Sequence, residues 1–205
     1  ESGVRPYTSS RRTAFLNWLY DSPSSGNTPL MGALEGAGKY YAGSEQSWAE
    51  DPSQAVSETN PALECRRAFT ILMTDGYYND SVSGFGNTDG TAGPTIGSFS
   101  YEAVSPFSDL TSNTLADIAM YYWKNDLRTD LDNRVRPTKL NPAFWQHMTT
   151  YGVGLGVTGS IDPDDAFTAI ESGDDITWPG TGTNAAKIDD LLHASVNSRG
   201  GFQRA

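Results

Sequence analysis

The sequence predicts one α/β domain, residues 1–205, with a mostly parallel sheet. Two short apolar runs, 68–74 and 149–157, each predict a buried strand. Helical patterns lie before, between and after these runs, and such alternation is typical of a parallel sheet flanked by helices. Glycines alternate along one face of the second run, which lets a helix pack close to it. The chain has 205 residues, 37% of them hydrophobic, which is enough for one core.

A helix is predicted to begin after Thr28. Thr28 suits the N-cap and Pro29 suits the first helical position. Apolar residues then recur at helical spacing as far as Tyr41, and Gly43 ends the pattern. The polar stretch 44–63 that follows predicts a surface loop.

The first strand, 68–74, ends at the tight turn Asp75-Gly76. The next stretch, 77–110, is rich in Gly, Ser, Asn, Asp and Pro and predicts a long loop inserted in the fold. Loops of this length are usually functional or disordered. Its aromatic residues are expected to pin it to the core, with a contact surface as the alternative: Tyr77, Tyr78, Phe85, Tyr101 and Phe107.

Three further helices are indicated by their ends. Thr114 and Asp117 form a capping-box pattern in front of an apolar stripe. A short helix over 162–169 is capped by its first acidic residue and closed by Gly173. The last helix is expected over 184–196.

The charge balance narrows the range of partners. The chain has 14 Lys and Arg against 25 Asp and Glu, a net charge of −11. Such a chain is not expected to bind nucleic acid or an anionic membrane, since phosphate binding needs a basic surface. No apolar stretch is long enough for membrane insertion. Acidic residues without basic neighbours, between Arg67 and Lys124 and between Leu155 and Ala186, predict either a surface that attracts cations or simply a soluble one.

Two residues suggest where a cation would bind. In an open parallel sheet, ligands bind beyond the carboxyl ends of the strands. Asp75 follows the first strand, and Thr28 lies at a junction between a loop and a helix. A hard cation prefers such carboxylate and hydroxyl oxygens. In the alternative interpretation, Thr28 is only a helix cap and Asp75 only a turn residue.

Several stretches together resemble a known family. They are similar to the von Willebrand factor type A domain, and more narrowly to the N-terminal domain of PilY-type proteins of the type IV pilus. The resemblance spans about residues 26–205 and rests on 26–30, on 65–67 leading into 71–79, and on 114–123, 143–148, 152–156 and 188–200.

The resemblance implies a Rossmann-like fold that holds Mg²⁺ or Ca²⁺ between three loops. The second loop supplies a Thr, matched by Thr28, and the third an Asp, matched by Asp75. The first loop, Asp-x-Ser-x-Ser, has no match, because Pro23 replaces a Ser in the nearest candidate, 21–25. The resemblance therefore implies that the first strand and its ligand loop lie upstream of Glu1, so that this chain is a fragment of the domain with an incomplete metal site.

The resemblance also implies a function without catalysis. The expected role is adhesion or assembly at the bacterial cell surface, the pilus tip or the periplasm. Pilins, minor pilins or host and surface ligands are the implied partners, and a partner carboxylate would complete the coordination of the cation. A mechanical role under tension is left open. A pairing of Cys65 with a cysteine outside this stretch is implied as well, and a lone thiol is the alternative.

The alternative from a different class is a secreted hydrolase or a small-molecule-binding α/β domain. Either would need polar groups that converge in one pocket around a titrating residue. The spacing of the sequence gives no such set. His147 is expected to pack beside Trp145, and His193 to lie on a helix surface.

Overall fold

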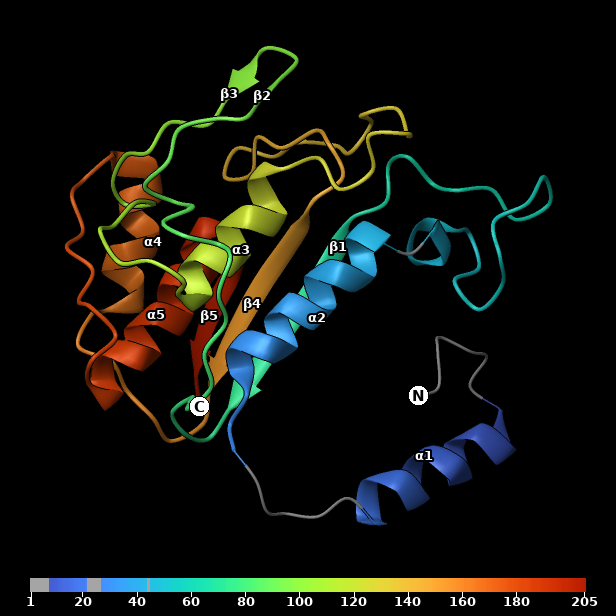
Figure 1. Cartoon of the computed structure of the whole chain (residues 1–205), viewed down its shortest axis with the longest axis horizontal. Helices are drawn as coiled ribbons and strands as arrows, with labels where there is room; N and C mark the ends of the chain where they lie inside the picture. The colour runs from blue at the N-terminus through green and yellow to red at the C-terminus, as the bar shows by residue number, and fades with distance from the viewer. Residues whose placement is uncertain (1–7, 22–26, 44) are drawn as a thin grey trace.

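The computed structural model describes residues 8–21, 27–43 and 45–205. Its elements are, in chain order, α1 (Ser9–Asp21), α2 (Leu30–Gly43), η1 (Glu45–Trp48), β1 (Ala68–Thr74), β2 (Thr95–Ile96), β3 (Phe99–Ser100), α3 (Leu115–Lys124), β4 (Met148–Gly154), α4 (Pro163–Ser172), α5 (Asn184–Asn197) and β5 (Gly201–Arg204). Figure 1 shows their arrangement around a central sheet.

The sheet has the order β1-β4-β5, and both pairs of strands are parallel. Ala68 lies opposite Met148, and Tyr151 lies opposite Gly201. The prediction of an α/β fold with a mostly parallel sheet flanked by helices is confirmed, and the arrangement fits a Rossmann-like fold. The short antiparallel hairpin of β2 and β3 lies within the long loop that follows β1.

Helices α2, α3 and α5 pack on one face of the sheet (Figure 1). Residues of β1 alternate, so that Ala68, Leu72 and Thr74 are buried beneath these helices. The core contains residues of the strands and helices together with two loop residues, Tyr78 and Leu127. Its other members are Leu30, Met31, Leu34, Leu72, Leu115, Ile118, Ala119, Tyr122, Met148, Leu191 and Ala194.

The opposite face of the sheet is uncovered within the described part of the chain. Phe69, Ile71 and Met73 of β1 are 48%, 68% and 57% exposed. The ring of Tyr151 on β4 lies 6.0 Å from that of Phe69. Among the described residues, β1 pairs with a strand on one edge only. Phe69, Ile71 and Met73 therefore form a continuous apolar surface on this face of the sheet. Apolar side chains of this size are normally buried against another part of a protein.

Close packing of α5 on β4 depends on glycine, as the sequence predicts. A Cβ atom on Gly152 would lie 2.9 Å from Oγ of Ser195 and 3.1 Å from Cγ of Leu191. Real Cβ atoms do not approach other atoms so closely. The missing side chain thus sets the distance between helix and sheet.

The interpretation of 44–63 as a surface loop is wrong for part of the stretch. Trp48 and Ala49 are fully buried. Trp48 donates its indole N–H to the carbonyl of Tyr41 over 2.8 Å, and its ring packs edge to face against that of Tyr41. A single large aromatic residue in polar surroundings gives no periodic signal, so this anchor was not predicted.

β5 and α1 lie outside every predicted element. β5 spans only four residues and becomes a strand because β4 supplies its hydrogen-bonding partner. Helix α1 buries none of its residues, and Phe15, Leu19 and Tyr20 are about half or more exposed. In the part of the chain that the structure describes, no helix combines the length and the apolar character needed to cross a bilayer.

Helix α2 offers a matched test of this packing. A Cβ on Gly38 would overlap the buried ring of Tyr122, whereas a Cβ on Gly36 has no neighbour within 4 Å. We expect Gly38→Ala to lower the free energy of unfolding by about 1–3 kcal/mol through overpacking. Gly36→Ala should raise it by about 0.5–1 kcal/mol, because alanine favours a helix. Urea denaturation followed by circular dichroism measures both, and equal effects of the two substitutions would contradict the packing of α2 on α3.

Candidate functional site

The loops that carry Thr28 and Asp75 lie side by side at the carboxyl end of the sheet. The backbone N–H of Thr28 donates to Oδ1 of Asn79 over 2.8 Å, and the N–H of Asn79 donates back to the carbonyl of Thr28 over 3.3 Å. Asn79 is only four residues beyond Asp75, which directly follows β1 and is exposed. The start of α2 and the end of β1 meet at this edge (Figure 1).

Thr28 is not the cap that its sequence position predicts. The N–H groups of Met31 and Gly32 donate instead to the carboxylate of Asp80, over 3.4 and 2.8 Å. No hydrogen bond among the described residues uses the hydroxyl of Thr28. Asp80 therefore caps α2 from a distant part of the chain, and the hydroxyl of Thr28 is left available for a ligand.

Asn79 and Asp80, which contact Thr28 and the first turn of α2, were not predicted from the sequence. Their effect depends on the return of the chain after β1 to the start of α2, some fifty residues earlier, which no local pattern records. Within the described residues, His, Cys, Asp and Glu form no group of three or more that could hold a metal ion. The pair Thr28 and Asp75 supplies only two side chains as ligands, and most of the near match 21–25 lies outside the described residues.

The first turn of α3 is held by a buried carboxylate, as the capping-box pattern predicts. Asp117 accepts hydrogen bonds from the N–H and the hydroxyl of Thr114, at 3.0 and 2.9 Å. Its other oxygen accepts from the N–H groups of Thr88 and Asp89, at 2.6 and 3.3 Å. One side chain therefore caps the helix and also anchors the long loop.

A second buried carboxylate reaches the same helix end from α5. Asp190 accepts from the N–H groups of Leu115 and Ala116, both at 3.0 Å, and from the hydroxyl of Tyr78 at 2.8 Å. Burial raises the pKa of Asp190 to about 6, although these hydrogen bonds oppose the shift. The negative charge faces the positive end of the helix dipole, which favours this arrangement.

The acidic stretch in the long loop does not form a cation-attracting surface throughout. Asp89 and Asp117 are fully buried. Asn197 of α5 donates its amide to Asp89 over 2.9 Å, and the N–H of Asp109 donates over 3.3 Å. Carboxylates at these positions organise the loop from inside, because their hydrogen-bond donors come from the backbone and from amide side chains.

The loop is also pinned by its aromatic residues, as predicted for most of them. Tyr78 and Tyr101 are almost fully buried, and the Tyr101 hydroxyl donates to the carbonyl of Asp89 over 2.7 Å. Lys124 at the end of α3 donates its ammonium group to the carbonyls of Thr88 and Thr91, at 2.7 and 2.8 Å. The rim of the sheet is therefore a fixed surface.

Both histidines are buried and pack against aromatic rings. His147 packs beside Trp145 as predicted, with ring centroids 6.1 Å apart, and burial lowers its pKa to about 4. His193 does not lie on a helix surface: it is 1% exposed and stacks on Trp178 with centroids 4.0 Å apart. Its ring donates to the carbonyl of Phe107, and burial lowers its pKa to about 3. The buried face of α5 is wider than its apolar residues indicate. It includes His193, which contacts Trp178 and the carbonyl of Phe107 in the long loop.

The buried acid Asp89 should make stability depend on pH. Burial, then the charges of Asp117 and Asp109, raises its pKa from 3.8 to about 8. The folded protein therefore keeps a proton that the unfolded chain loses, and the free energy of unfolding should fall as the pH rises towards 8. We expect Asp89→Asn to remove most of this fall between pH 7.5 and 8.5, a range above the pKa of about 6.5 of histidines in the unfolded chain, so that nearly all histidines are neutral in both states.

Urea midpoints at intervals of half a pH unit measure this effect. Asp175→Asn, at an exposed position, is the control and should keep the pH dependence of the parent protein. An unchanged slope in Asp89→Asn would mean that Asp89 is ionised in the folded protein at neutral pH.

The chain matches known type IV pilus proteins in sequence. No family model matches it, and no solved structure matches it. The sequence is 34% identical to the type IV pilus biogenesis factor PilY1 of Pseudomonas aeruginosa strain PAO1, over 97% of this chain and 19% of that protein. It is 33% identical to PilY1 of strain UCBPP-PA14, over 92% of this chain and 18% of that protein.

Along nearly its whole length, the chain is therefore similar to one part of a much longer protein. It spans about a fifth of the length of these curated relatives. With PilY1 of Pseudomonas aeruginosa strain PAK it shares 35% identity over 97% of its own residues and 19% of that protein, which makes it similar to a segment of a type IV pilus biogenesis factor.

Proposed function

We propose that this chain is a non-catalytic module of a type IV pilus biogenesis protein, acting at the bacterial cell surface, at the pilus tip or in the periplasm. Its partners are pilus components such as pilins and minor pilins, or ligands on a host or other surface. The module is a von Willebrand factor A-like domain. Its contact face is the carboxyl edge of the sheet, where Thr28 and Asp75 contribute to a site for Mg²⁺ or Ca²⁺.

The main support for this proposal is that Asn79 holds the loop after β1, which carries Asp75, against the loop before α2, which carries Thr28. Two hydrogen bonds join Asn79 to the backbone of Thr28, so an exposed carboxylate and a free hydroxyl share one rim. Oxygens of this kind suit a hard cation, and further oxygens from outside this stretch would complete its coordination. An open coordination position would then accept a carboxylate from the partner.

The similarity to PilY1 along nearly the whole chain supports a role in pilus biogenesis rather than a hydrolase. The histidines add to this, since each is buried, hydrogen-bonded to a backbone carbonyl and depressed in pKa. A general base needs access to a substrate and a pKa near the working pH. A secreted hydrolase or a small-molecule-binding domain has no comparable support.

A chimera tests the biogenesis role directly. In a Pseudomonas aeruginosa strain that lacks PilY1, PilY1 with its matching segment replaced by this chain should restore at least half of the surface pili and of twitching motility. PilY1 with that segment deleted is the control. Surface pilin equal to that of the deletion, with the chimera present at normal abundance on an immunoblot, would overturn the proposed function.

The cation site is tested in the same chimera. We expect Asp75→Ala, which removes a carboxylate ligand, to reduce the number of Ca²⁺ or Mg²⁺ ions retained in equilibrium dialysis by one per molecule. Thr28→Ala should weaken retention about tenfold or more, because it removes one neutral ligand. Asp175→Ala, at an exposed position on the loop after α4, should retain every ion. Retention that does not change in Asp75→Ala would refute the site while leaving the biogenesis role intact.

A further inference from the structure

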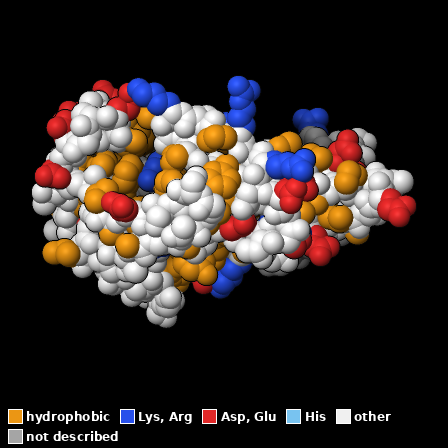
Figure 2. Space-filling view, turned by 90° about the horizontal axis from the view of Figure 1, so that it is seen from above, with side chains coloured by type: hydrophobic (Ala, Val, Ile, Leu, Met, Phe, Trp, Pro, Cys, Tyr) orange, Lys and Arg blue, Asp and Glu red, His pale blue; other side chains and the backbone are white. Residues whose placement is uncertain are grey.

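Two neighbouring cavities open where the parallel strands begin, at the opposite end of the sheet from Asp75. Their volumes are about 270 and 260 Å³, and Arg199 and Leu140 line both. Figure 2 looks onto this end of the molecule and shows hydrophobic side chains gathered around a recess in which Lys or Arg atoms are visible. Each cavity has room for one side chain rather than for a large ligand.

The cavity of about 260 Å³ is basic. Arg67, Arg136 and Arg199 line it, and no Asp or Glu does. This concentration is unusual in a chain with 25 acidic and 14 basic residues. His147 also faces this cavity, and after burial the charges of Arg67 and Arg199 contribute to its low pKa. The interior of this cavity is therefore electropositive and favours an anion.

Arg199 is fixed in position by its neighbours. Its guanidinium carbon lies 3.5 Å from the ring centroid of Phe107 and 4.0 Å from that of Trp123. Its Nη1 donates to the carbonyls of Val196 and Asn197, at 3.3 and 2.6 Å. The two hydrogen bonds are typical of the C-terminal end of a helix, where a cationic side chain is attracted to the last free carbonyl groups.

Two features of Arg199 go beyond capping. Its φ angle is +58°, a left-handed conformation that glycine usually adopts at this position after a helix. Its Nε and Nη2 atoms have no hydrogen-bond partner among the described residues. The backbone therefore holds a guanidinium with two donor atoms still available, in a planar arrangement that matches a carboxylate.

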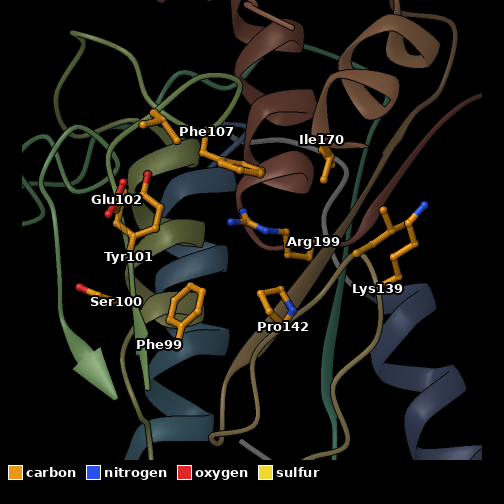
Figure 3. A pocket seen from close by; sticks show the side chains of 11 residues that line it. Phe99, Ser100, Tyr101, Glu102, Phe107, Lys139, Pro142, Ile170 and Arg199 are labelled. Carbon is orange, nitrogen blue, oxygen red and sulfur yellow. The ribbon is translucent and has the colours of Figure 1, made fainter. Parts of the chain in front are cut away.

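The cavity of about 270 Å³ is mainly aromatic and apolar. In Figure 3 the rings of Phe99 and Tyr101 lie on one side of it and Pro142 and Ile170 on the other, with Arg199 between them. Two charged residues, Glu102 and Lys139, also line it; Glu102 is exposed, and the ammonium group of Lys139 is paired with Glu171. This cavity suits an apolar or aromatic side chain.

We propose that the paired cavities bind the C-terminal residue of a partner protein, when that residue has an aromatic or aliphatic side chain. The terminal carboxylate enters the basic cavity and pairs with Arg199 and Arg136, and the side chain enters the aromatic cavity. Because Arg199 lines both cavities, a single residue that carries both a carboxylate and a side chain, as at a C-terminus, can fill the two together. This site is independent of the proposed cation rim, which lies at the other end of the strands.

The test uses small probes and the whole chain labelled with ¹⁵N. N-acetyl-L-phenylalanine should bind saturably in an NMR titration and shift the signals of Gly200 and of the Arg199 Nε–H. We expect its Kd to be about tenfold lower than that of N-acetyl-L-phenylalaninamide, which lacks the carboxylate, and than that of N-acetylglycine, which lacks the ring.

Matched variants locate the binding. Arg136→Gln changes an exposed residue whose side chain has no hydrogen bond within the described part of the chain, and it should raise the Kd about fivefold or more. Arg134→Gln, two residues earlier, removes an exposed guanidinium that pairs with Glu64 and Asp132 outside both cavities, and it should leave the Kd unchanged.

Four results would overturn the proposal. These are the absence of saturable binding, equal binding of the acid and the amide, equal effects of the two arginine variants, and equal or tighter binding of inorganic phosphate. An internal carboxylate is tested with the peptide acetyl-Gly-Glu-Phe-Gly-amide. Tighter binding of this peptide than of acetyl-Gly-Gly-Phe with a free C-terminus would overturn the assignment to a C-terminal residue.

Discussion

The fold depends on two carboxylates buried at the start of α3. Asp117 and Asp190 accept hydrogen bonds from the first N–H groups of this helix, from Thr114 and from the loop at Thr88 and Asp89. A helix end buried without such partners would leave several donors unsatisfied, each at a cost of about 1–3 kcal/mol. The long loop after β1, α3 and α5 are therefore joined at one polar centre inside an apolar core.

This centre explains how a loop of more than thirty residues stays ordered. The loop contributes few regular hydrogen bonds of its own, apart from the hairpin of β2 and β3. It is held instead by Asp117, by Lys124, and by the buried rings of Tyr78 and Tyr101. The loop residues at both ends of the sheet are therefore held in place, those at the rim beside Asn79 and those at the cavities around Arg199.

The molecule is polarised along its strands. The carboxyl end carries the exposed carboxylate of Asp75 and the hydroxyl of Thr28, which are the ligands of the proposed cation site. The amino end carries three arginines around one cavity, which suit an anion. Between these ends, one face of the sheet is covered by helices and the other exposes the apolar side chains of β1.

The sequence by itself determined the fold class, the two long strands, four of the helices and the capping box of Thr114 and Asp117. These features are encoded by periodicity and by residues a few positions apart, so they require no knowledge of distant contacts. The resemblance of its motifs likewise indicated the relatives that it matches. The sequence also singled out Thr28 and Asp75 as candidate cation ligands, because each stands at a recognisable boundary between a loop and a regular element, and this stays a prediction.

Only the tertiary structure decided which acids are buried, what caps α2 and where the arginines converge. Asp80 caps a helix that begins fifty residues earlier, and His193 is buried because Trp178 and the long loop cover that side of α5. β5 is a strand only because β4 lies beside it, and Arg67, Arg136 and Arg199 share a cavity although they are widely separated along the chain. Such features depend on long-range contacts, whereas a local pattern records only the preferences of neighbouring residues.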